Sequence, residues 1–249
     1  MSRLKSDLTH TPQIWLFHTG ECAPSDFSPT PAAWFSPSER IRFSQFTSAR
    51  AKRQFLQSRL LIRQALSYNF SLPINHWDIE SHPDSAPKIN NAAYPLNISL
   101  SHSHDWIAVA LGSDRLGVDI EKIKPRHLTE AAPIFMTGAE LDRFLSSPSE
   151  IEFYRAWCLK EACYKAFPDR QKQRSLHQID TLTLINEACS IVALGNSDYL
   201  LAFYSAQPVD RVSCYLLGSD SQNWQRIDTQ QSPAVTFLDM SSDELNGSI

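Results

Sequence analysis

Two hydrophobic patterns follow each other along the chain, one with the spacing of a helix and one with the spacing of a strand. The stretch "QIWLFH" (13–18) predicts a strand. "SPSERIRFSQF" predicts a helix in which Ser36 caps the start, Pro37 suits the first turn and Glu39 completes a capping box. A longer helix is predicted for "ARAKRQFLQSRLLIRQALSYNF", because its apolar residues recur on one side at helical spacing.

Short apolar runs after these helices predict strands in "WDIES", "LNISLS" and "WIAVALG", and "GSDR" (112–115) turns the chain back into "LGVDIEKI" as a hairpin. The same order then recurs. "TGAELDRFLSS" begins with a capping box from Thr137 to Glu140, and "SPSE" (147–150), another capping box, leads into the helix "FYRAWCLKEACYKAF" (153–167). Strands are predicted after it in "HQIDTLTLI", "CSIVALG", "YLLAFYS" and "RVSCYLL".

The repeated order of short capped helix, longer helix and antiparallel strands indicates an internal duplication. The predicted fold class is α+β, with two similar α+β halves related by pseudo-two-fold symmetry. The halves are expected to span residues 1–113 and 114–235, followed by a disordered tail over 236–249. A cleft between two such halves is a usual place for a ligand, and a duplicated chain predicts a monomer.

The composition is that of an ordinary globular protein, with 42% hydrophobic and 20% charged residues among 249. No apolar run approaches the roughly 20 residues needed to span a bilayer, and the start lacks the long apolar region of a signal peptide. We therefore expect a cytoplasmic protein with no membrane partner. The five cysteines are an odd number without metal-ligand spacing, so we interpret them as reduced structural thiols.

The net charge of −4 hides a basic stretch from Arg40 to Arg63, which has seven Arg and Lys residues after the single acid Glu39. Such a stretch predicts a basic surface and an anionic partner. No nucleic-acid-binding motif or aromatic-interleaved basic run accompanies it, so nucleic acid is not the expected partner. A phosphate ligand or an acidic protein fits the sequence better.

The motif "GVDIE" places Asp119 and Glu121 two residues apart on a predicted strand. Their side chains leave the same face about 6.8 Å apart, where their repulsion is on the order of 2 kcal/mol at an effective dielectric near 20. A solvated strand face is the ordinary alternative. Because the other face is apolar and the strand ends a predicted hairpin, we expect the acids to bind a cation, and oxygen ligands favour Mg²⁺ over zinc.

Trp157, Glu161 and Lys165 lie four residues apart along one side of the predicted helix 153–167. The ordinary reading of the Glu–Lys spacing is a surface pair that contributes about 0.2–0.5 kcal/mol. If the helix packs on the "GVDIE" strand, Glu161 becomes a third acid that coordinates a metal or acts as a base. Lys165 would then balance negative charge, and Trp157 would pack the helix against the strand.

The run "SLSHSH" places His102 and His104 on one face of a predicted strand. A zinc site would need further ligands that the nearby sequence lacks, and no nucleophile elbow supports a Ser–His catalytic pair. A phosphate contact by His102, aided by small hydroxyls such as that of Ser101, suits the run better. Lys88 in "SAPKI" lies just upstream and offers a second positive charge.

In order, "SLSHS", "GVDIE" and "WCLKEACYKA" resemble the motifs of the 4'-phosphopantetheinyl transferases, of the larger two-halved type that activates polyketide, nonribosomal peptide and fatty-acid synthases. The resemblance spans roughly residues 35 to 215. It implies a fold of two similar α+β halves, in agreement with the duplication. It also implies that the phosphopantetheine arm of coenzyme A is moved onto a serine of an apo acyl or peptidyl carrier protein, releasing adenosine 3',5'-bisphosphate.

The resemblance also implies roles for individual residues. Asp119, Glu121 and Glu161 would surround Mg²⁺ bound to the pyrophosphate, with Glu161 as the preferred base. Lys160 and Lys165 would lie near the same phosphates. The adenosine 3'-phosphate would be held by His102, Lys88 and an arginine in the 50s, with Arg53 as the first choice.

One departure from the family pattern concerns Lys88, which follows Ala86-Pro87 where family members often have Gly-Lys-Pro. The N-terminal half is expected to contact coenzyme A and the carrier, and the C-terminal half to supply the metal-binding acids. Two other functions stay open at this point. One is a catalytically idle coenzyme A or nucleotide-binding module, and the other is a Mg²⁺-dependent phosphodiester hydrolase that needs no carrier.

Overall fold

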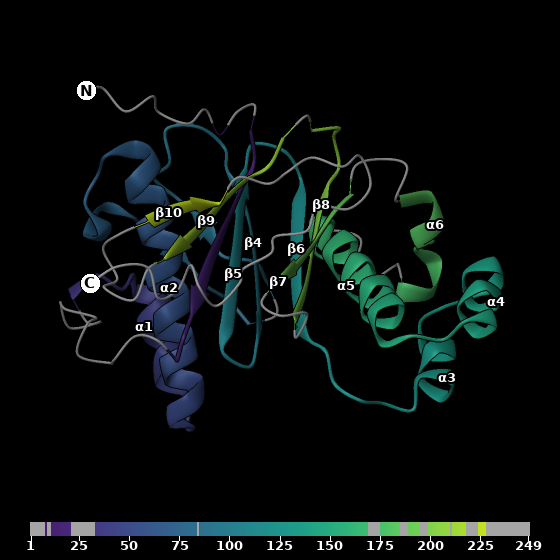
Figure 1. Ribbon diagram of the computed structural model, residues 1–249. Helices are drawn as coiled ribbons and strands as arrows, with labels where there is room; N and C mark the ends of the chain where they lie inside the picture. Colours follow the sequence, from purple (N-terminus) through teal and green to yellow (C-terminus); the bar gives the residue numbers. More distant parts are fainter. Residues whose placement is uncertain are drawn as a thin grey trace, which may run out of the picture.

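The computed structural model in Figure 1 describes residue 8 and residues 11–20, 33–83, 85–168, 175–184, 189–194, 199–209, 211–217 and 224–227. Its strands are β1 (Gln13–His18), β2 (Ile79–Glu80), β3 (Lys88–Ile89), β4 (Asn97–Ser103), β5 (Trp106–Gly112), β6 (Leu116–Lys122), β7 (Cys189–Leu194), β8 (Tyr199–Ser205), β9 (Ser213–Leu217) and β10 (Trp224–Ile227). Its α-helices are α1 (Pro37–Gln45), α2 (Ala49–Phe70), α3 (Leu128–Ala131), α4 (Gly138–Ser146), α5 (Glu150–Ala166) and α6 (Thr181–Leu184), with 3₁₀ turns at Ile74–His76, Ala132–Ile134 and Leu176–Gln178. The tail 236–249, predicted to be disordered, lies outside the described residues.

The first sheet has the strand order β10-β9-β1-β5-β4. Its central strand β1 pairs antiparallel with β5 and parallel with β9, so that Trp15 lies between Val109 and Tyr215. The strands β9 and β10 follow residue 114 in the chain, yet they complete a sheet that begins with β1. The division into halves at residue 113 stays a prediction, and this sheet joins strands from both sides of it.

The second sheet has the order β6-β8-β7, with both pairs antiparallel. The predicted hairpin between "WIAVALG" and "LGVDIEKI" is therefore wrong, since β5 and β6 belong to different sheets. The turn at 113–115 carries the chain from one sheet to the other. This crossing brings β6 beside β4, the edge strand of the first sheet.

The helices cover the outer faces of the two sheets, and the sheets face each other (Figure 1). One apolar cluster packs α2 residues such as Ile62 on the first sheet, and another packs α5 residues such as Leu159 on the second. A third cluster joins Ile14 and Ala110 of the first sheet to Val118 of the second. The layers thus run helix, sheet, sheet, helix, which confirms the mixed α+β class, while the pseudo-two-fold symmetry stays a prediction.

The helix-start signals had mixed outcomes. The capping box of Ser36 and Glu39 is formed at α1, as predicted. At α4 no side chain caps the helix, because the Thr137 hydroxyl donates to the backbone oxygen of His177 and the Glu140 carboxylate turns inward to Thr181. The cap of α5 is Ser149, two residues after the predicted one. The predicted strand in "HQIDTLTLI" is wrong, since these residues form a 3₁₀ turn and α6.

Helix α5 lies close to β6 at Gly117. A Cβ atom at this position would lie 1.8 Å from the backbone oxygen of Ala162, so only glycine allows this contact. The glycine of "GVDIE" therefore sets the spacing between the acidic strand and α5.

Two further predictions can be compared with the described residues. The thiols of Cys158 and Cys214 are free and buried, and burial raises the pKa of Cys214 to about 12, as expected for an unreactive structural thiol. Among the helices of the described chain, none has the length and hydropathy needed to pass through a bilayer.

Candidate active site

The largest set of predicted site residues lines one cavity of about 760 Å³, within the usual range for a small-molecule site. Four groups of residues form its walls: Asp119 and Glu121 of β6; Trp157, Glu161 and Lys165 of α5; Ser99, Leu100, Ser101 and His102 of β4; and Arg42, Phe46, Phe55 and Arg59 in and near α1 and α2. The segment 85–87 and His82 close the rim. Both acids of "GVDIE" and the α5 stripe therefore meet at one site.

The carboxylate of Asp119 is buried and partly paired. Its Oδ1 accepts hydrogen bonds from Ser101 Oγ at 2.8 Å and from Lys165 Nζ at 2.6 Å. Its Oδ2 is buried and has no hydrogen-bond partner among the described residues. A buried carboxylate oxygen without a hydrogen bond is stabilised when a cation or a further donor approaches it.

The α5 stripe differs from an ordinary surface pair. Among the described residues, Lys165 forms its ion pair with Asp119 and none with Glu161. Lys165 also donates to Ser101 Oγ at 3.1 Å. The ring of Trp157 packs edge-to-face on Phe135 at 5.1 Å and fixes the start of the stripe.

The two other acids are held in a state that resists ionisation. Burial raises the pKa of Glu161, and the nearby Asp119 and Glu121 carboxylates raise it further, while Lys165 opposes them. Burial also raises the pKa of Glu121, against the hydrogen bond from Ser103. Both acids are therefore harder to ionise than an exposed carboxyl, and a cation bound beside them would favour their ionised form.

The donor chemistry of the cavity fits Mg²⁺. The available ligands are carboxylate oxygens, one of them the unpartnered Oδ2 of Asp119, and Mg²⁺ commonly takes one or two carboxylates with waters and substrate phosphates. Within the described residues no group of three or more His, Cys, Asp or Glu side chains is arranged to hold a metal ion. The sharing of one ion by Asp119, Glu121 and Glu161 stays a prediction, and Lys165 is the cation that contacts Asp119 in this structure.

Residues 115–214 match the family model of the 4'-phosphopantetheinyl transferase superfamily. This segment, less than half of the chain, is therefore similar to that superfamily. It contains β6 and α5, the two elements that supply the acids and Lys165.

Individual relatives carry the same family description. The chain is 32% identical over 116 residues to the 4'-phosphopantetheinyl transferase psf-1 of Bacillus pumilus, covering 45% of this chain and 49% of the relative. It is 26% identical over 136 residues to the 4'-phosphopantetheinyl transferase Sfp of Bacillus subtilis (strain 168), covering 53% and 60%. It is 28% identical over 173 residues to the human L-aminoadipate-semialdehyde dehydrogenase-phosphopantetheinyl transferase, covering 61% and 54%. The chain thus spans about half the length of the curated relatives it matches.

The predicted role of Lys160 as a phosphate-binding residue needs correction. The structure places the Lys160 ammonium on the opposite side of α5, fully buried, where it pairs with Glu140 Oε2 at 2.7 Å and donates to the backbone oxygen of Ile179. It is absent from the cavity lining because one residue along a helix rotates the side chain by about 100°. Within the motif "KEA", the lysine therefore anchors α5 and the glutamate faces the site.

The choice of Arg53 also needs correction. Arg53 is exposed on α2 and does not line the cavity, whereas Arg42 and Arg59 do. Arg59 is buried against Phe55, donates to Ser81 at 2.7 Å, and has no hydrogen-bond partner for Nη1 among the described residues. Its burial lowers its pKa to about 10. The sequence identified the basic stretch but not the rotation of the helices, so it could not select these two arginines.

Lys88 lies beside the cavity rather than on its wall. It is exposed on β3 opposite Glu80, while residues 85–87 just before it line the rim. The structure therefore does not bring Lys88 into the cavity.

His102 lines the cavity, as predicted, and His104 does not. His104 occupies the turn after β4 with a φ of 51°, so the two imidazoles do not share a strand face. Desolvation by the cavity wall lowers the pKa of His102, and the Lys165 and Arg50 cations lower it further. Two arginines in the 50s therefore bear on this site: Arg59, which lines the cavity, and Arg50, whose charge lowers the pKa of His102.

The predicted basic surface is smaller than the charge pattern suggested. Arg63 is fully buried and forms two hydrogen bonds with Glu39, including Nη1 to Oε1 at 2.8 Å. Arg59 Nε lies 3.5 Å from the same carboxylate. The exposed basic residues of this stretch are Arg40, Arg50 and Arg53, with Arg42 and Lys52 half-buried.

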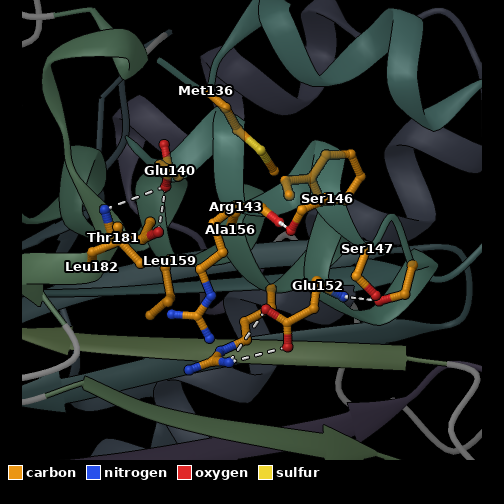
Figure 2. Close-up of a pocket in the computed structure, with 13 residues that line it drawn as sticks. Met136, Glu140, Arg143, Ser146, Ser147, Glu152, Ala156, Leu159, Thr181 and Leu182 are labelled. Atoms are coloured by element: carbon orange, nitrogen blue, oxygen red, sulfur yellow. Dashed lines mark hydrogen bonds and ion pairs between the residues drawn. The ribbon is translucent and has the colours of Figure 1, made fainter. Parts of the chain in front are cut away.

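A second cavity of about 370 Å³ lies on the far side of α5, between α4, α5 and α6 (Figure 2). Its wall combines apolar side chains such as Met136 and Leu159 with an Arg155–Glu152 pair and the Thr181–Glu140 contact. None of the predicted site residues lines it. It is therefore not the candidate active site.

Proposed function

We propose that the chain transfers the 4'-phosphopantetheine group of coenzyme A to a serine of an apo carrier protein, with Mg²⁺ as the required ion. The observation that carries this proposal is the meeting of Asp119, Glu121, Glu161 and Lys165 in one cavity that arginines also line. The curated relatives named above are phosphopantetheinyl transferases, which supports the same reaction. The larger, two-halved type is proposed on the element order and the two helix-covered sheets.

The cavity supplies the parts that this reaction needs. The serine oxygen of the carrier bonds to the phosphorus that bears pantetheine, the phosphoanhydride bond breaks, and adenosine 3',5'-bisphosphate leaves. Bound Mg²⁺ would neutralise charge on the diphosphate, with Asp119, Glu121 and Glu161 as its candidate ligands. Glu161 is the proposed acceptor of the serine proton, directly or through a water, because its raised pKa makes it a better base than an ordinary carboxylate.

Positive side chains would hold the other phosphates. Lys165 lies beside Asp119 and is the proposed contact for the diphosphate. His102, Arg42 and Arg59 line the other walls and are the proposed contacts for the remaining phosphate of coenzyme A, with Ser101 between the two groups. Exposed basic residues such as Arg50 and Arg53 would attract acidic carrier proteins by long-range steering. A monomeric state and a cytoplasmic location stay predictions.

The proposal is tested by incubating the chain with coenzyme A, Mg²⁺ and several apo-carriers, and then weighing the products. We expect a carrier to gain the mass of one phosphopantetheinyl group, and chelation of Mg²⁺ to abolish the gain. Release of phosphopantetheine to water without a carrier would indicate a hydrolase instead. Binding of coenzyme A without any transfer would indicate an idle binding module.

A further inference from the structure

Strand β4 presents a row of serines to β6. The side chains of Ser99, Ser101 and Ser103 each accept a hydrogen bond from a β6 backbone amide, those of Val118 at 3.0 Å, Ile120 at 3.3 Å and Lys122 at 3.1 Å. Each pair is 19 residues apart in the chain, so β4 and β6 run parallel here. Serine hydroxyls therefore satisfy the edge amides of β6 that no strand carbonyl reaches.

Two of the three hydroxyls also donate to the candidate metal ligands. Ser101 Oγ donates to Asp119 Oδ1 at 2.8 Å, and Ser103 Oγ donates to Glu121 Oε2 at 2.9 Å. A hydroxyl has a single proton, so each of these serines is committed to one carboxylate. Ser99 has the same amide contact but no carboxylate to donate to, since the chain has glycine at position 117.

Ser103 holds Glu121 from outside the cavity. It is 7% exposed and absent from the cavity lining, whereas Glu121 lines it. Among the described residues, Ser103 is the only hydrogen-bond partner of the Glu121 carboxylate. The nearby His104 Nδ1 lies farther away, at 3.4 Å, and a neutral acceptor competes poorly with a carboxylate.

We propose that Ser103 is a positioning residue that fixes the Glu121 carboxylate for a divalent ion, an inference that rests on the proposed function. By tying Oε2 and the Lys122 amide to one hydroxyl, Ser103 sets both the rotamer of Glu121 and its distance from β4. Loss of such an outer hydrogen-bond partner lowers metal affinity by about 10–100-fold in known sites.

The test measures Mn²⁺ binding by electron paramagnetic resonance, with and without coenzyme A, alongside thermal unfolding. The variants are Ser103→Ala, Ser103→Thr and the matched control Ser99→Ala. We expect Ser103→Ala to weaken Mn²⁺ binding about tenfold or more, and Ser103→Thr, which keeps the hydroxyl, to restore most of the affinity. Ser99 lines the cavity but donates to neither acid of β6. Ser99→Ala should lower the unfolding temperature about as much as Ser103→Ala, because each loses one amide contact, yet bind Mn²⁺ like the parent chain.

Three outcomes would overturn the proposal. One is that Ser103→Ala binds Mn²⁺ as tightly as the parent chain. Another is that Ser99→Ala weakens Mn²⁺ binding as much as Ser103→Ala does, which would show that the serines only hold β4 against β6. The third is an absence of Mn²⁺ binding by the parent chain under both conditions. The expected Mn²⁺ pattern without any carrier modification would support the role of Ser103 while refuting the transferase function, so the two failures can be told apart.

Discussion

At the scale of single residues, the site holds three carboxyl groups, of Asp119, Glu121 and Glu161, and Lys165 forms an ion pair with the first of them. The Asp119 carboxylate has one oxygen paired with Lys165 and one oxygen buried without a partner among the described residues. Glu161 lies nearby and interacts electrostatically with both Asp119 and Glu121. Ionised carboxylates gathered in this way destabilise the folded chain until a cation joins them.

The first prediction follows from the raised pKa of Glu161. A carboxyl whose pKa is higher in the folded chain than its ordinary 4.5 destabilises the fold once the pH rises through the folded value. In the absence of divalent ions, Glu161→Gln should therefore unfold at a higher temperature than the parent chain near neutral pH. The difference should vanish below about pH 4.5, where both states are protonated.

Thermal unfolding across this pH range checks the prediction, with the surface substitution Glu130→Gln as control. A Glu161→Gln variant that is less stable than the parent chain at neutral pH would contradict it.

The second prediction concerns Gly117. An alanine there would place Cβ 1.8 Å from the Ala162 oxygen and push α5 away from β6. Gly117→Ala should cost about 3 kcal/mol of unfolding free energy or more, at the upper end for overpacked sites. Gly112→Ala is the matched control, because its Cβ would meet mainly the end of the Leu116 side chain. Equal denaturation midpoints for the two variants would show that α5 is not pinned at Gly117.

At the scale of elements, one side of α5 faces the cavity and the opposite side is buried, and the sequence could predict only the first of these two sides. The spacing of Trp157, Glu161 and Lys165 predicted one stripe, and the structure confirms that it faces a single cavity with the β6 acids. The family resemblance implied that Lys160 lies near the same phosphates, and the sequence could not tell a charged residue that faces a site from one that is buried against another helix. A buried Lys–Glu pair gives no distinctive local pattern, since its partner Glu140 lies on α4.

The third prediction concerns that buried pair. Lys160→Met leaves the Glu140 carboxylate buried without its cation, which should cost about 3–5 kcal/mol of unfolding free energy. The double variant Lys160→Met with Glu140→Gln should recover part of this loss, because the uncompensated charge is gone. Denaturant unfolding measures both, with Lys124→Met on an exposed lysine as control. Additive losses in the double variant would rule out the pair as a coupled anchor.

At the scale of the whole molecule, most of the helices and strands were predictable apart from the strand expected in "HQIDTLTLI", while the membership of the sheets was not. Strands such as 13–18 followed from their apolar patterns and were confirmed. The pairing of β1 with β9 depends on contacts between residues about 200 apart, which no local pattern records. For the same reason, the helix rotations that bring Arg42 and Arg59 to the cavity, and leave Arg53 outside it, could not be derived from the sequence.

The fourth prediction tests this arrangement of the arginines. Arg42→Ala should raise the KM for coenzyme A about tenfold with little change in kcat, the loss expected for one charged hydrogen bond to phosphate. Arg53→Ala removes the same charge from outside the cavity and should leave this KM within about twofold. Steady-state transfer at a saturating carrier concentration separates the two variants. A larger effect of Arg53 than of Arg42 would show that coenzyme A binds elsewhere.

The central claim is that the acids of β6 and the glutamate of α5 serve one divalent ion in the cavity between them. It is tested most directly by a crystal structure of the chain with coenzyme A and Mn²⁺, in which anomalous scattering locates the ion. The account predicts one ion at the carboxylates of Asp119 and Glu121, with Glu161 beside it and Lys165 moved from Asp119 to a phosphate. An ion away from these acids, or coenzyme A bound in the second cavity between α4, α5 and α6, would contradict it.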